Sequence, residues 1–593
     1  MSREFRRVGV VGLGTMGAGI AEVLARGGIE VVGVELDERA LERGRAHIEK
    51  STSRAVSRGK LTEEAKDQIL ARVSFASTID GLAGTGLVIE AVPERLELKR
   101  DVVGAIDRAC PPETVIATNT SSLPVTEVAT ATGRPSRVVG VHFFNPAPVM
   151  KLVEIVHTVV TEPEVTSGVE KLVRSLGKRP VRCGDRAGFI ANHLLFGYLN
   201  QAAAMYESGQ ASREDIDAAM RLGADLPMGP LTLLDLIGVD TAYEVCEALF
   251  AEFRDRRYAP APAITQMVTA GLLGRKSGRG FYTYEAPGSA TVVPDSLTPP
   301  GRDAEPRAER VESIGVVGAG ELATGVVESC ARAGYDVTFV ARGEEQASAL
   351  VSSVERALEE HVSRGKLDEL GKKAALQRVH PSQDLADLGG CGLIAEAADE
   401  DLETKRSLFA ELGGVAPPGA VLATMTSSIP VIDMAVASNR PGDVVGMHVL
   451  TSNPATKVIE VVETVLTSPH TAAVAREVCH RFARTPVRCG DRAGFITGAL
   501  LFPYLNDAVA MLENGYASAD DIDAAMKLGC GYPMGPLEML DAIGLDRVLA
   551  VQRAIYREAR EPGLAPSPLL ERLVTAGYLG RRSGWGVRDY AQA

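Results

Sequence analysis

The sequence predicts an α/β domain with a parallel sheet followed by an all-α helical domain, and this pair of domains is repeated twice along the chain. Three observations predict it. A single offset aligns the first half of the chain with the second. In each half, apolar runs of strand length alternate with longer segments of helical periodicity, as in βαβ units. From Gly188 onward, and again from Gly494, the pattern becomes helical only.

The two halves, called copy 1 and copy 2 below, are a tandem duplication. The segment RCGDRAGFI occurs unchanged at residues 182–190 and 488–496. Residues 285–312 are rich in proline, charge and small side chains, which is typical of a linker. The expected domains are residues 1–187 and 188–284 in copy 1, and 313–493 and 494–593 in copy 2. The shared offset of 306 residues pairs Gly12 with Gly318, Glu90 with Glu396, His142 with His448, Asp185 with Asp491 and Pro227 with Pro533.

Composition excludes several classes of protein. A chain of 593 residues that is 45% apolar and 24% charged is long enough for several domains with real cores. The net charge of -14 argues against a nucleic-acid-binding protein. No signal-peptide pattern or membrane-spanning apolar run is visible, so we expect a cytoplasmic protein without membrane partners. The eight cysteines lack CxxC spacing, which indicates neither a disulfide framework nor a metal site.

The first strand–helix–strand unit carries a glycine motif. Gly12, Gly14 and Gly17 form GxGxxG between a strand and a helix, and Glu35 ends the next strand. Glycines at these points let the backbone approach a pyrophosphate at the helix N-terminus, while Glu35 accepts hydrogen bonds from a ribose. This carboxylate would repel a 2′-phosphate, so the pattern favours NAD over NADP in a Rossmann domain. The alternatives are ordinary turn glycines and a solvated glutamate.

Further strand-like runs lie at residues 87–92, 115–122 and 138–144. Their continuous apolar character suits a parallel sheet covered on both faces, and their polar ends suit a ligand crevice at the carboxyl edge. The residues at or just after these ends are Glu94, Lys99, Ser121, His142 and Asn145. In the helical region, Ser212 and Asp215 have the spacing of a helix N-terminal cap.

One histidine and one glutamate interrupt an apolar stretch in both copies. Among the nine histidines only His142 and His448 occupy equivalent positions, and Glu154 and Glu460 follow them twelve residues later. An isolated histidine near a core is usually structural, and a shared structural role would also explain the pairing. If the site is catalytic, the imidazole can serve as a general base in one direction and a general acid in the other.

Five motifs of copy 1 resemble those of the 3-hydroxyacyl-CoA dehydrogenase family, and best its 3-hydroxybutyryl-CoA branch. The resemblance covers nearly all of copy 1 and implies NAD-linked interconversion of an L-3-hydroxyacyl-CoA and its 3-ketoacyl-CoA. It implies His142 as the base and Glu154 as the group that orients it. The motifs are TNTSSL at 118–123, HFFNPAPVMKLVEIV at 142–156, GFIANHLL at 188–195, LPMGP at 226–230 and GRKSGRGFY at 274–282.

The same resemblance implies further roles, residue by residue. Ser121 and Asn192 would surround the reacting oxygen, and Asn145 would lie beside the nicotinamide. Other cofactor contacts would come from Glu94, Lys99 and Lys276.

A basic segment precedes the third strand of copy 1. Between Arg39 and Lys60 there are seven basic residues and two acidic ones, in an otherwise acidic protein. The plain interpretation is a solvated helical face. In the resembled family this segment is a helical arm that binds the phosphates of CoA, and Ser51, Arg54 and Arg58 are the expected contacts.

Copy 2 departs from this pattern and is expected to be degenerate. Its window 345–366, matching the basic segment, holds three basic residues and four acids. Ser427, His448 and Glu460 remain. Arg342 would suit a 2′-phosphate, although nothing else supports an NADP site. The replacements, copy 1 residue first, are Gly17 by Ala323, Glu35 by Ala341, Asn119 by Met425, Asn145 by Thr451, Asn192 by Gly498 and Lys276 by Arg582.

Because single-copy members of the family pair through their helical domains, we expect the two copies to form an intramolecular pseudo-dimer. Two other functions stay open from sequence alone. One is a dehydrogenase of a free hydroxy acid, as in the gulonate-oxidising relatives. The other is a non-catalytic nucleotide-binding or structural protein, because this fold hosts many roles.

Overall fold

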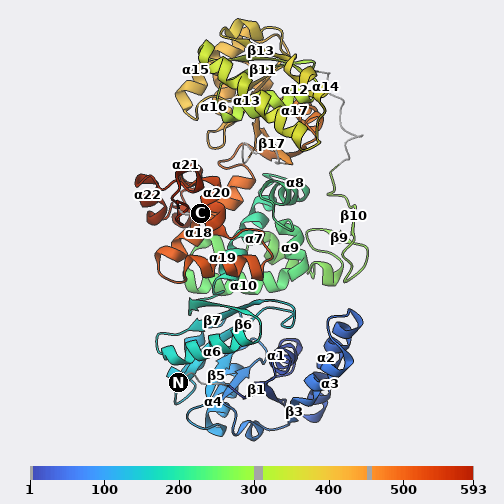
Figure 1. Cartoon of the computed structure of the whole chain (residues 1–593), viewed down its shortest axis with the longest axis vertical. Coiled ribbons are helices and arrows are strands. Elements are labelled where there is room, and N and C mark those ends of the chain that lie inside the picture. The colour runs from blue at the N-terminus through green and yellow to red at the C-terminus, as the bar shows by residue number, and fades with distance from the viewer. Residues whose placement is uncertain (1–4, 300–310, 450–456, 592–593) are drawn as a thin grey trace.

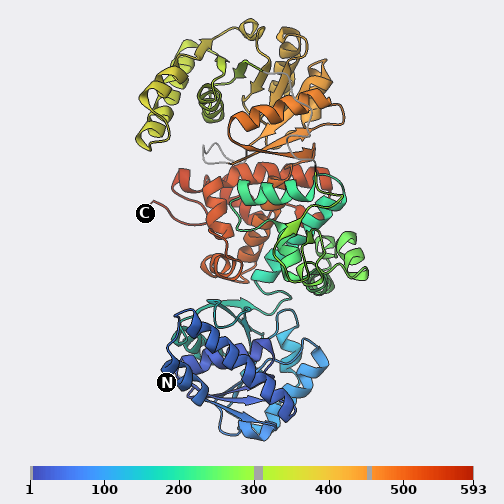
Figure 2. The ribbon, with the colours of Figure 1, turned by 90° about the vertical axis from the view of Figure 1, so that its right-hand side faces the viewer.

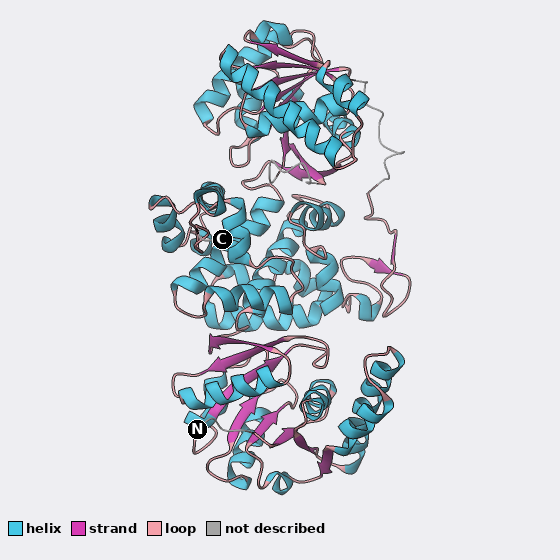
Figure 3. Cartoon of the chain, viewed as in Figure 1, coloured by secondary structure: helices cyan, strands magenta, loops and turns pink. Residues whose placement is uncertain are grey.

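The structure is a computed structural model that describes residues 5–299, 311–449 and 457–591. Two α/β domains lie at opposite ends of the molecule, and the two helical domains lie between them (Figures 1 and 2). Helices cover the sheets and make up most of the middle layer (Figure 3). This arrangement confirms the predicted fold class, an α/β Rossmann domain and an all-α domain repeated twice. In the part of the chain described, no helix is long and apolar enough to cross a membrane.

The sheet of copy 1 has eight strands in the order β3-β2-β1-β4-β5-β6-β7-β8. The first six strands of the chain are parallel, β7 is antiparallel to β6, and β8 is parallel to β7. Strands β4 and β5 end at Glu90 and Thr118, so both are shorter than the predicted strands at 87–92 and 115–122. The strands are β1 (Arg7–Val11), β2 (Glu30–Val34), β3 (Val73–Ala76), β4 (Leu87–Glu90), β5 (Val115–Thr118), β6 (Val138–Phe143), β7 (Leu152–His157) and β8 (Arg179–Gly184).

Copy 2 repeats this sheet with the order β13-β12-β11-β14-β15-β16-β17-β18. The repetition of both order and register follows from the ungapped duplication of the sequence. Its strands are β11 (Ser313–Val317), β12 (Asp336–Val340), β13 (Val379–Ser382), β14 (Leu393–Glu396), β15 (Val421–Thr424), β16 (Val444–His448), β17 (Val458–Glu463) and β18 (Thr485–Gly490).

Helices cover the faces of both sheets, as right-handed crossovers between parallel strands require. In copy 1 they are α1 (Thr15–Arg26), α2 (Glu38–Ser57), α3 (Glu63–Ala71), α4 (Leu96–Ala109), α5 (Val125–Ala129) and α6 (Pro163–Ser175). In copy 2 they are α12 (Glu321–Arg332), α13 (Glu344–Ser363), α14 (Glu369–Leu376), α15 (Leu402–Val415), α16 (Val431–Ala437) and α17 (Pro469–Arg481).

The helical domains follow directly on the last strand of each sheet. The predicted cap is present, since the Ser212 hydroxyl accepts from the amide of Asp215 at 3.1 Å. Copy 1 has α7 (Ala191–Glu207), α8 (Arg213–Ala218), the π-helical turn η3 (Ala219–Gly223), α9 (Pro230–Ile237), α10 (Val239–Phe253) and α11 (Pro262–Thr269). Copy 2 has α18 (Thr497–Glu513), α19 (Ala519–Gly529), α20 (Pro536–Ile543), α21 (Leu545–Ala559) and α22 (Pro568–Thr575).

The two helical domains pack against each other through α7 and α18. The Gln201 side-chain amide donates to the carbonyl of Ala499 at 2.8 Å. Arg257 forms an ion pair with Asp507 at 3.0 Å, and both side chains are mostly buried. One cluster of buried apolar side chains runs through both domains. The middle layer therefore has a single hydrophobic core to which both copies contribute.

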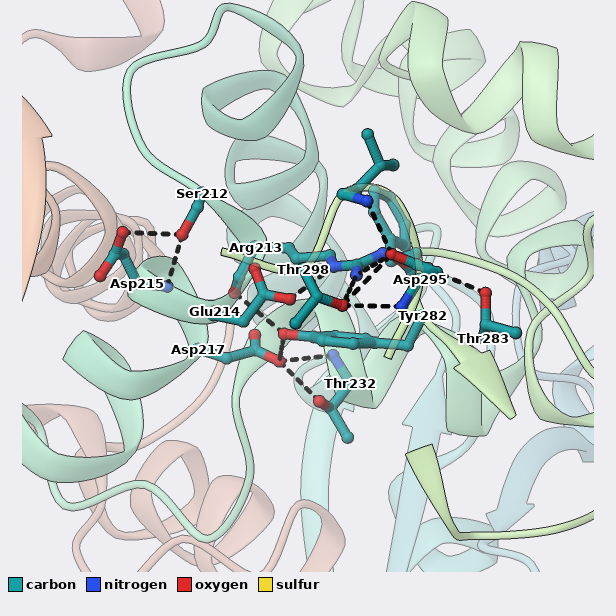
Figure 4. Close-up of polar contacts among 12 residues, drawn as sticks. Ser212, Arg213, Glu214, Asp215, Asp217, Thr232, Tyr282, Thr283, Asp295 and Thr298 are labelled. Carbon is teal, nitrogen blue, oxygen red and sulfur yellow. Dashed lines mark hydrogen bonds and ion pairs between the residues drawn. The ribbon is translucent and has the colours of Figure 1, made fainter. Parts of the chain in front are cut away.

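The first part of the predicted linker folds back onto the helical domain of copy 1. Strands β9 (Thr283–Tyr284) and β10 (Val292–Val293) form a short hairpin. Beyond it, Asp295 accepts from the guanidinium of the buried Arg213 at 2.6 Å, as Figure 4 shows. Arg213 also donates to the carbonyl of Phe281 at 2.6 Å and lies over the Tyr282 ring. Residues 300–310 of the predicted linker lie outside the described part.

Replacing Arg213 by alanine is expected to lower the melting temperature by about 5 °C or more. The change leaves Asp295 and the Phe281 carbonyl without their charged donor, and breaking such a pair costs on the order of 3 kcal/mol. Arg256→Ala is the control, since Arg256 is 82% exposed and its ion pair with Glu561 should contribute little. Equal melting of the two variants would contradict the role of Arg213.

The stabilisation by the Arg213–Asp295 ion pair should also depend on pH. The hydrogen bond from Arg213 holds the pKa of Asp295 well below its usual range. Because the folded pKa is depressed, the stabilisation is complete above the unfolded pKa of about 4 and is lost as the pH falls through the folded value. Below about pH 4, the difference in melting temperature between Arg213→Ala and the wild type should therefore shrink.

Candidate active site

His142 and Glu154 meet across two neighbouring strands. They are opposite one another in the antiparallel β6–β7 register, and His142 Nδ1 lies 2.7 Å from Glu154 Oε2. The other carboxylate oxygen accepts from the amides of Ile190 at 3.1 Å and Ala191 at 2.9 Å, at the start of α7. Glu154 is completely buried and His142 nearly so. The carboxylate thus holds the Nδ1 side of the ring, so Nε2 is the ring nitrogen that it does not engage, and it ties the sheet to the helical domain.

Two phenylalanine rings flank this imidazole. The Phe144 ring centroid is 4.5 Å from that of His142, and the Phe189 centroid is 5.6 Å away. An imidazole held between two aromatic rings and a buried carboxylate has few rotamers open to it. These contacts hold the imidazole in one orientation.

Glu94 organises the loop that carries Ser121. Its Oε1 accepts from the Thr120 hydroxyl at 2.6 Å and from the Ser121 amide at 2.9 Å. Burial alone would raise the pKa of Glu94, but Lys99 and these hydrogen bonds hold it below its usual value. Lys99 is completely buried, 2.9 Å from Glu90 and 3.3 Å from Glu94. The predicted contacts of Glu94 and Lys99 with the cofactor remain predictions, while their positioning of the serine loop is direct.

The glycine loop fits a dinucleotide. Gly12 has φ +88°, a left-handed conformation that favours glycine, and a Cβ on Gly17 would lie 1.7 Å from the Gly12 carbonyl oxygen. A Cβ on Gly14, by contrast, would meet nothing within 4 Å, so the loop is open on that side. Glu35 Oε1 accepts from the Leu13 amide at 2.6 Å, which places the carboxylate against the loop. These residues are suited to hold NAD, with its pyrophosphate at the N-terminus of α1.

The remaining predicted residues of copy 1 are spread more widely. Asn192 is the second residue of α7, next to the amide that binds Glu154, and Asn145 is exposed just after β6. Lys276 is 2.5 Å from Asp240 within the helical domain. The expected CoA contacts lie on α2 or at its C-terminal end, at one side of the α/β domain (Figure 1): Ser51 is partly exposed, and Arg54 and Arg58 are exposed.

Copy 2 retains the dyad in a large cleft. His448 Nδ1 lies 2.5 Å from Glu460 Oε2, and Glu460 Oε1 accepts from both the amide and the hydroxyl of Thr497. Ser427 is held by Glu400, as Ser121 is by Glu94. The cleft has a volume of about 1230 Å³, and its lining includes the glycine loop, Ser427, His448 and Gly498.

The nucleotide loop of copy 2 differs in both shape and charge. Ala323 replaces Gly17, and Gly318 has φ +132° where Gly12 has +88°. Glu321 is the first residue of α12, where copy 1 has Thr15, so copy 2 carries an acidic side chain in the first turn of this helix, and that carboxylate is 3.9 Å from Arg547. Ala341 stands at the position of Glu35, the carboxylate expected to bind the ribose, and Arg342 lies 3.4 Å from Asp399. Thr451, the counterpart of Asn145, lies outside the described residues.

Two positioning residues were not assigned a role from sequence. Glu90 accepts from Lys99 and from the Thr118 hydroxyl at 2.6 Å, and Asp185 accepts from the amides of Val125 and Thr126 at the start of α5. Both occur at the same position in copy 2, as Glu396 and Asp491. Identity between the copies was the available signal, but it does not distinguish a structural role from a chemical one.

Comparison with known proteins identifies the family. The family model for the 3-hydroxyacyl-CoA dehydrogenase NAD binding domain matches residues 7–186 and 313–492. The model for the C-terminal domain of the same family matches residues 188–284 and 494–590. These matches cover nearly all of both copies.

Some similar proteins match one copy of this chain, and others match both copies. A 3-hydroxybutyryl-CoA dehydrogenase of Mycobacterium tuberculosis is 48% identical over 286 residues, which is 48% of this chain and all of that protein. A 3-hydroxyadipyl-CoA dehydrogenase of Escherichia coli is 31% identical over 585 residues, covering 98% of this chain and all of that protein. A crystal structure of 3-hydroxybutyryl-CoA dehydrogenase from Escherichia coli superposes with a TM-score of 0.70 at 30% identity, over 97% of this chain and all of that one.

These matches agree with the glycine loop, the histidine–glutamate dyad and the two-domain repeat. The chain belongs to the 3-hydroxyacyl-CoA dehydrogenase family of NAD-dependent oxidoreductases.

Proposed function

We propose that copy 1 interconverts a short-chain L-3-hydroxyacyl-CoA and its 3-ketoacyl-CoA, with 3-hydroxybutyryl-CoA and acetoacetyl-CoA as the example. The observation that carries this proposal is that copy 1 combines the dyad with Gly17 and Glu35, whereas copy 2 keeps the dyad but has Ala323 and Ala341 at those two positions. Bound NAD supplies the hydride acceptor for oxidation. Nε2 of His142 takes the hydroxyl proton, and Glu154 stabilises the imidazolium that forms.

The remaining assignments belong to the same proposal. Ser121 and Asn192 hydrogen-bond the reacting oxygen, and Ser51, Arg54 and Arg58 bind the phosphates of CoA. The cofactor residues are Gly12, Gly14, Gly17, Glu35, Glu94, Lys99, Asn145 and Lys276. The domain limits are those expected from the sequence.

Copy 2 serves mainly as a structural partner in this proposal, and the two copies act as an intramolecular pseudo-dimer. The packing of α7 on α18 and the buried Arg257–Asp507 pair support it. The carboxylate of Glu321 also argues against dinucleotide binding in copy 2, because it would repel a pyrophosphate at the start of α12.

A second candidate substrate is a 3-hydroxyacyl-CoA whose acyl chain ends in a carboxylate. Its support is the relative named 3-hydroxyadipyl-CoA dehydrogenase, which matches both copies over 98% of this chain. The wider alternatives are a free hydroxy acid and a role without turnover. Residues 39–60 of copy 1 carry seven basic and two acidic side chains, whereas the matching residues 345–366 of copy 2 carry three basic and four acidic ones. A basic segment attracts the phosphates of CoA, so this difference favours a CoA ester bound by copy 1.

The test is NADH oxidation with acetoacetyl-CoA, 3-ketoadipyl-CoA and the matching free acids. We expect kcat/KM for a CoA ester to exceed that for its free acid by about 10³-fold or more, because the basic arm of copy 1 binds the phosphates of CoA. A preference for 3-ketoadipyl-CoA would select the second candidate. Turnover of the free acids alone would contradict the proposal, and so would the absence of turnover with every substrate.

A further inference from the structure

The helical domain of each copy lies behind the dyad of the other copy. Helix α19 of copy 2 packs on β7 and β8 of copy 1, and α8 and η3 of copy 1 pack on β18 and β17 of copy 2. The hydroxyl of Tyr516, just before α19, donates to the carbonyl of Gly184 at the end of β8 at 2.9 Å. The catalytic histidine and glutamate of copy 1 therefore have a neighbour that is more than 300 residues away in the sequence.

The C-terminal end of α19 reaches this dyad. A Cβ built on Gly529 would lie 2.9 Å from Leu152 Cδ2 and 3.3 Å from Cε1 of Phe144. Leu152 is two residues before Glu154 on β7, and the Phe144 ring is the one 4.5 Å from His142. The next residue, Cys530, is close enough that burial and the charge of Glu154 raise the pKa of its thiol to about 12.

We propose that Gly529 of copy 2 is a positioning residue for the copy 1 site: by lacking a side chain, it leaves room for Phe144 to lie against the imidazole of His142. Copy 2 thereby contributes a residue beside the copy 1 site, in addition to packing its helical domain against that of copy 1. This inference rests on the proposed function, since it requires copy 1 to be the catalytic copy.

The chain contains a matched control for this position. Gly223 of copy 1 is the counterpart of Gly529, and a Cβ on it would lie 2.9 Å from Val458 Cγ1 and 3.4 Å from Thr497 Oγ1, behind the dyad of copy 2. Both glycines end a helical element and neither has a positive φ. Valine at either site meets an apolar side chain at the same distance, so the two variants have comparable packing costs.

The first experiment measures kcat and KM with acetoacetyl-CoA and NADH for Gly529→Val and Gly223→Val. We expect Gly529→Val to lower kcat about 10-fold or more with KM for NADH unchanged, because displacing Phe144 misplaces the imidazole while the glycine loop is untouched. Gly223→Val should keep kcat within about two-fold of the wild type. Gly529→Ala, a smaller intrusion, should lower kcat by about two- to three-fold and serves if the valine variant does not fold.

A double-mutant cycle tests the route through Phe144. In a Phe144→Leu background, the smaller side chain no longer passes the displacement caused by Gly529→Val on to the imidazole of His142. Gly529→Val should therefore lower kcat by less than about three-fold in that background. An undiminished cost in that background would overturn the route, and wild-type kcat in Gly529→Val would overturn the inference while leaving the proposed function intact. Loss of kcat in Gly223→Val alone would instead show that copy 2 does the chemistry, and would overturn both.

Discussion

His142→Gln is expected to lower kcat with acetoacetyl-CoA and NADH by about 10²–10⁴-fold, the usual contribution of a positioned general acid–base group. Glutamine is close to histidine in reach but does not exchange a proton near neutral pH. The Glu154 carboxylate can still accept a hydrogen bond from the glutamine amide, so the fold around the dyad should be kept. The measurement is steady-state NADH oxidation, with thermal melting to show that the variant is folded.

His448→Gln is the matched control, because His448 has the same partner at 2.5 Å in copy 2. We expect it to keep at least about half of the wild-type kcat, since the nucleotide loop beside it carries Ala323 and Glu321. Retention of about half the activity in His142→Gln would contradict this account and show that copy 2 turns over substrate.

Glu154→Ala is expected to affect both catalysis and stability. The change removes the acceptor of His142 Nδ1 and of the Ile190 and Ala191 amides. Each buried donor left without a partner costs about 1–3 kcal/mol, so unfolding should become easier by on the order of 4 kcal/mol. The ring also loses the group that fixes its tautomer and stabilises its charged form, and kcat should fall on the order of 10²–10³-fold.

Glu460→Ala separates the two effects. Glu460 accepts from His448, from two amides at the start of α18 and from the Thr497 hydroxyl, so its removal should destabilise the protein at least as much. At temperatures below its melting temperature, the variant should nevertheless keep kcat within about two-fold of the wild-type value. An equal loss of kcat in both variants would mean that the carboxylates act on activity only through the stability of the fold.

The dyad shows how far sequence pattern reaches. The twelve-residue spacing of histidine and glutamate recurs in both copies, and the family resemblance implied that the glutamate orients the histidine. The antiparallel β6–β7 register places the two opposite one another. The link from Glu154 to the start of α7 was not predicted, because a contact of 36 residues' separation between a strand and a helix leaves no periodic trace. The positioning of the Ser121 loop by Glu94, with the buried Lys99 beside it, was not predicted either. The reason is the same, because burial of a lysine is a property of packing.

The sequence by itself determined the repeated α/β and helical domains, the family, the cofactor class and the difference between the copies. The family follows from the resemblance of five motifs, and the rest follows from local patterns: hydrophobic periodicity, glycines at a fixed spacing and residues paired by a constant offset. Only the tertiary structure decided that Arg213 anchors residue 295, that Glu321 lies at the phosphate end of α12, and that Gly529 contacts Phe144 beside His142. Such contacts join segments up to several hundred residues apart, and they are set by how whole domains pack against one another.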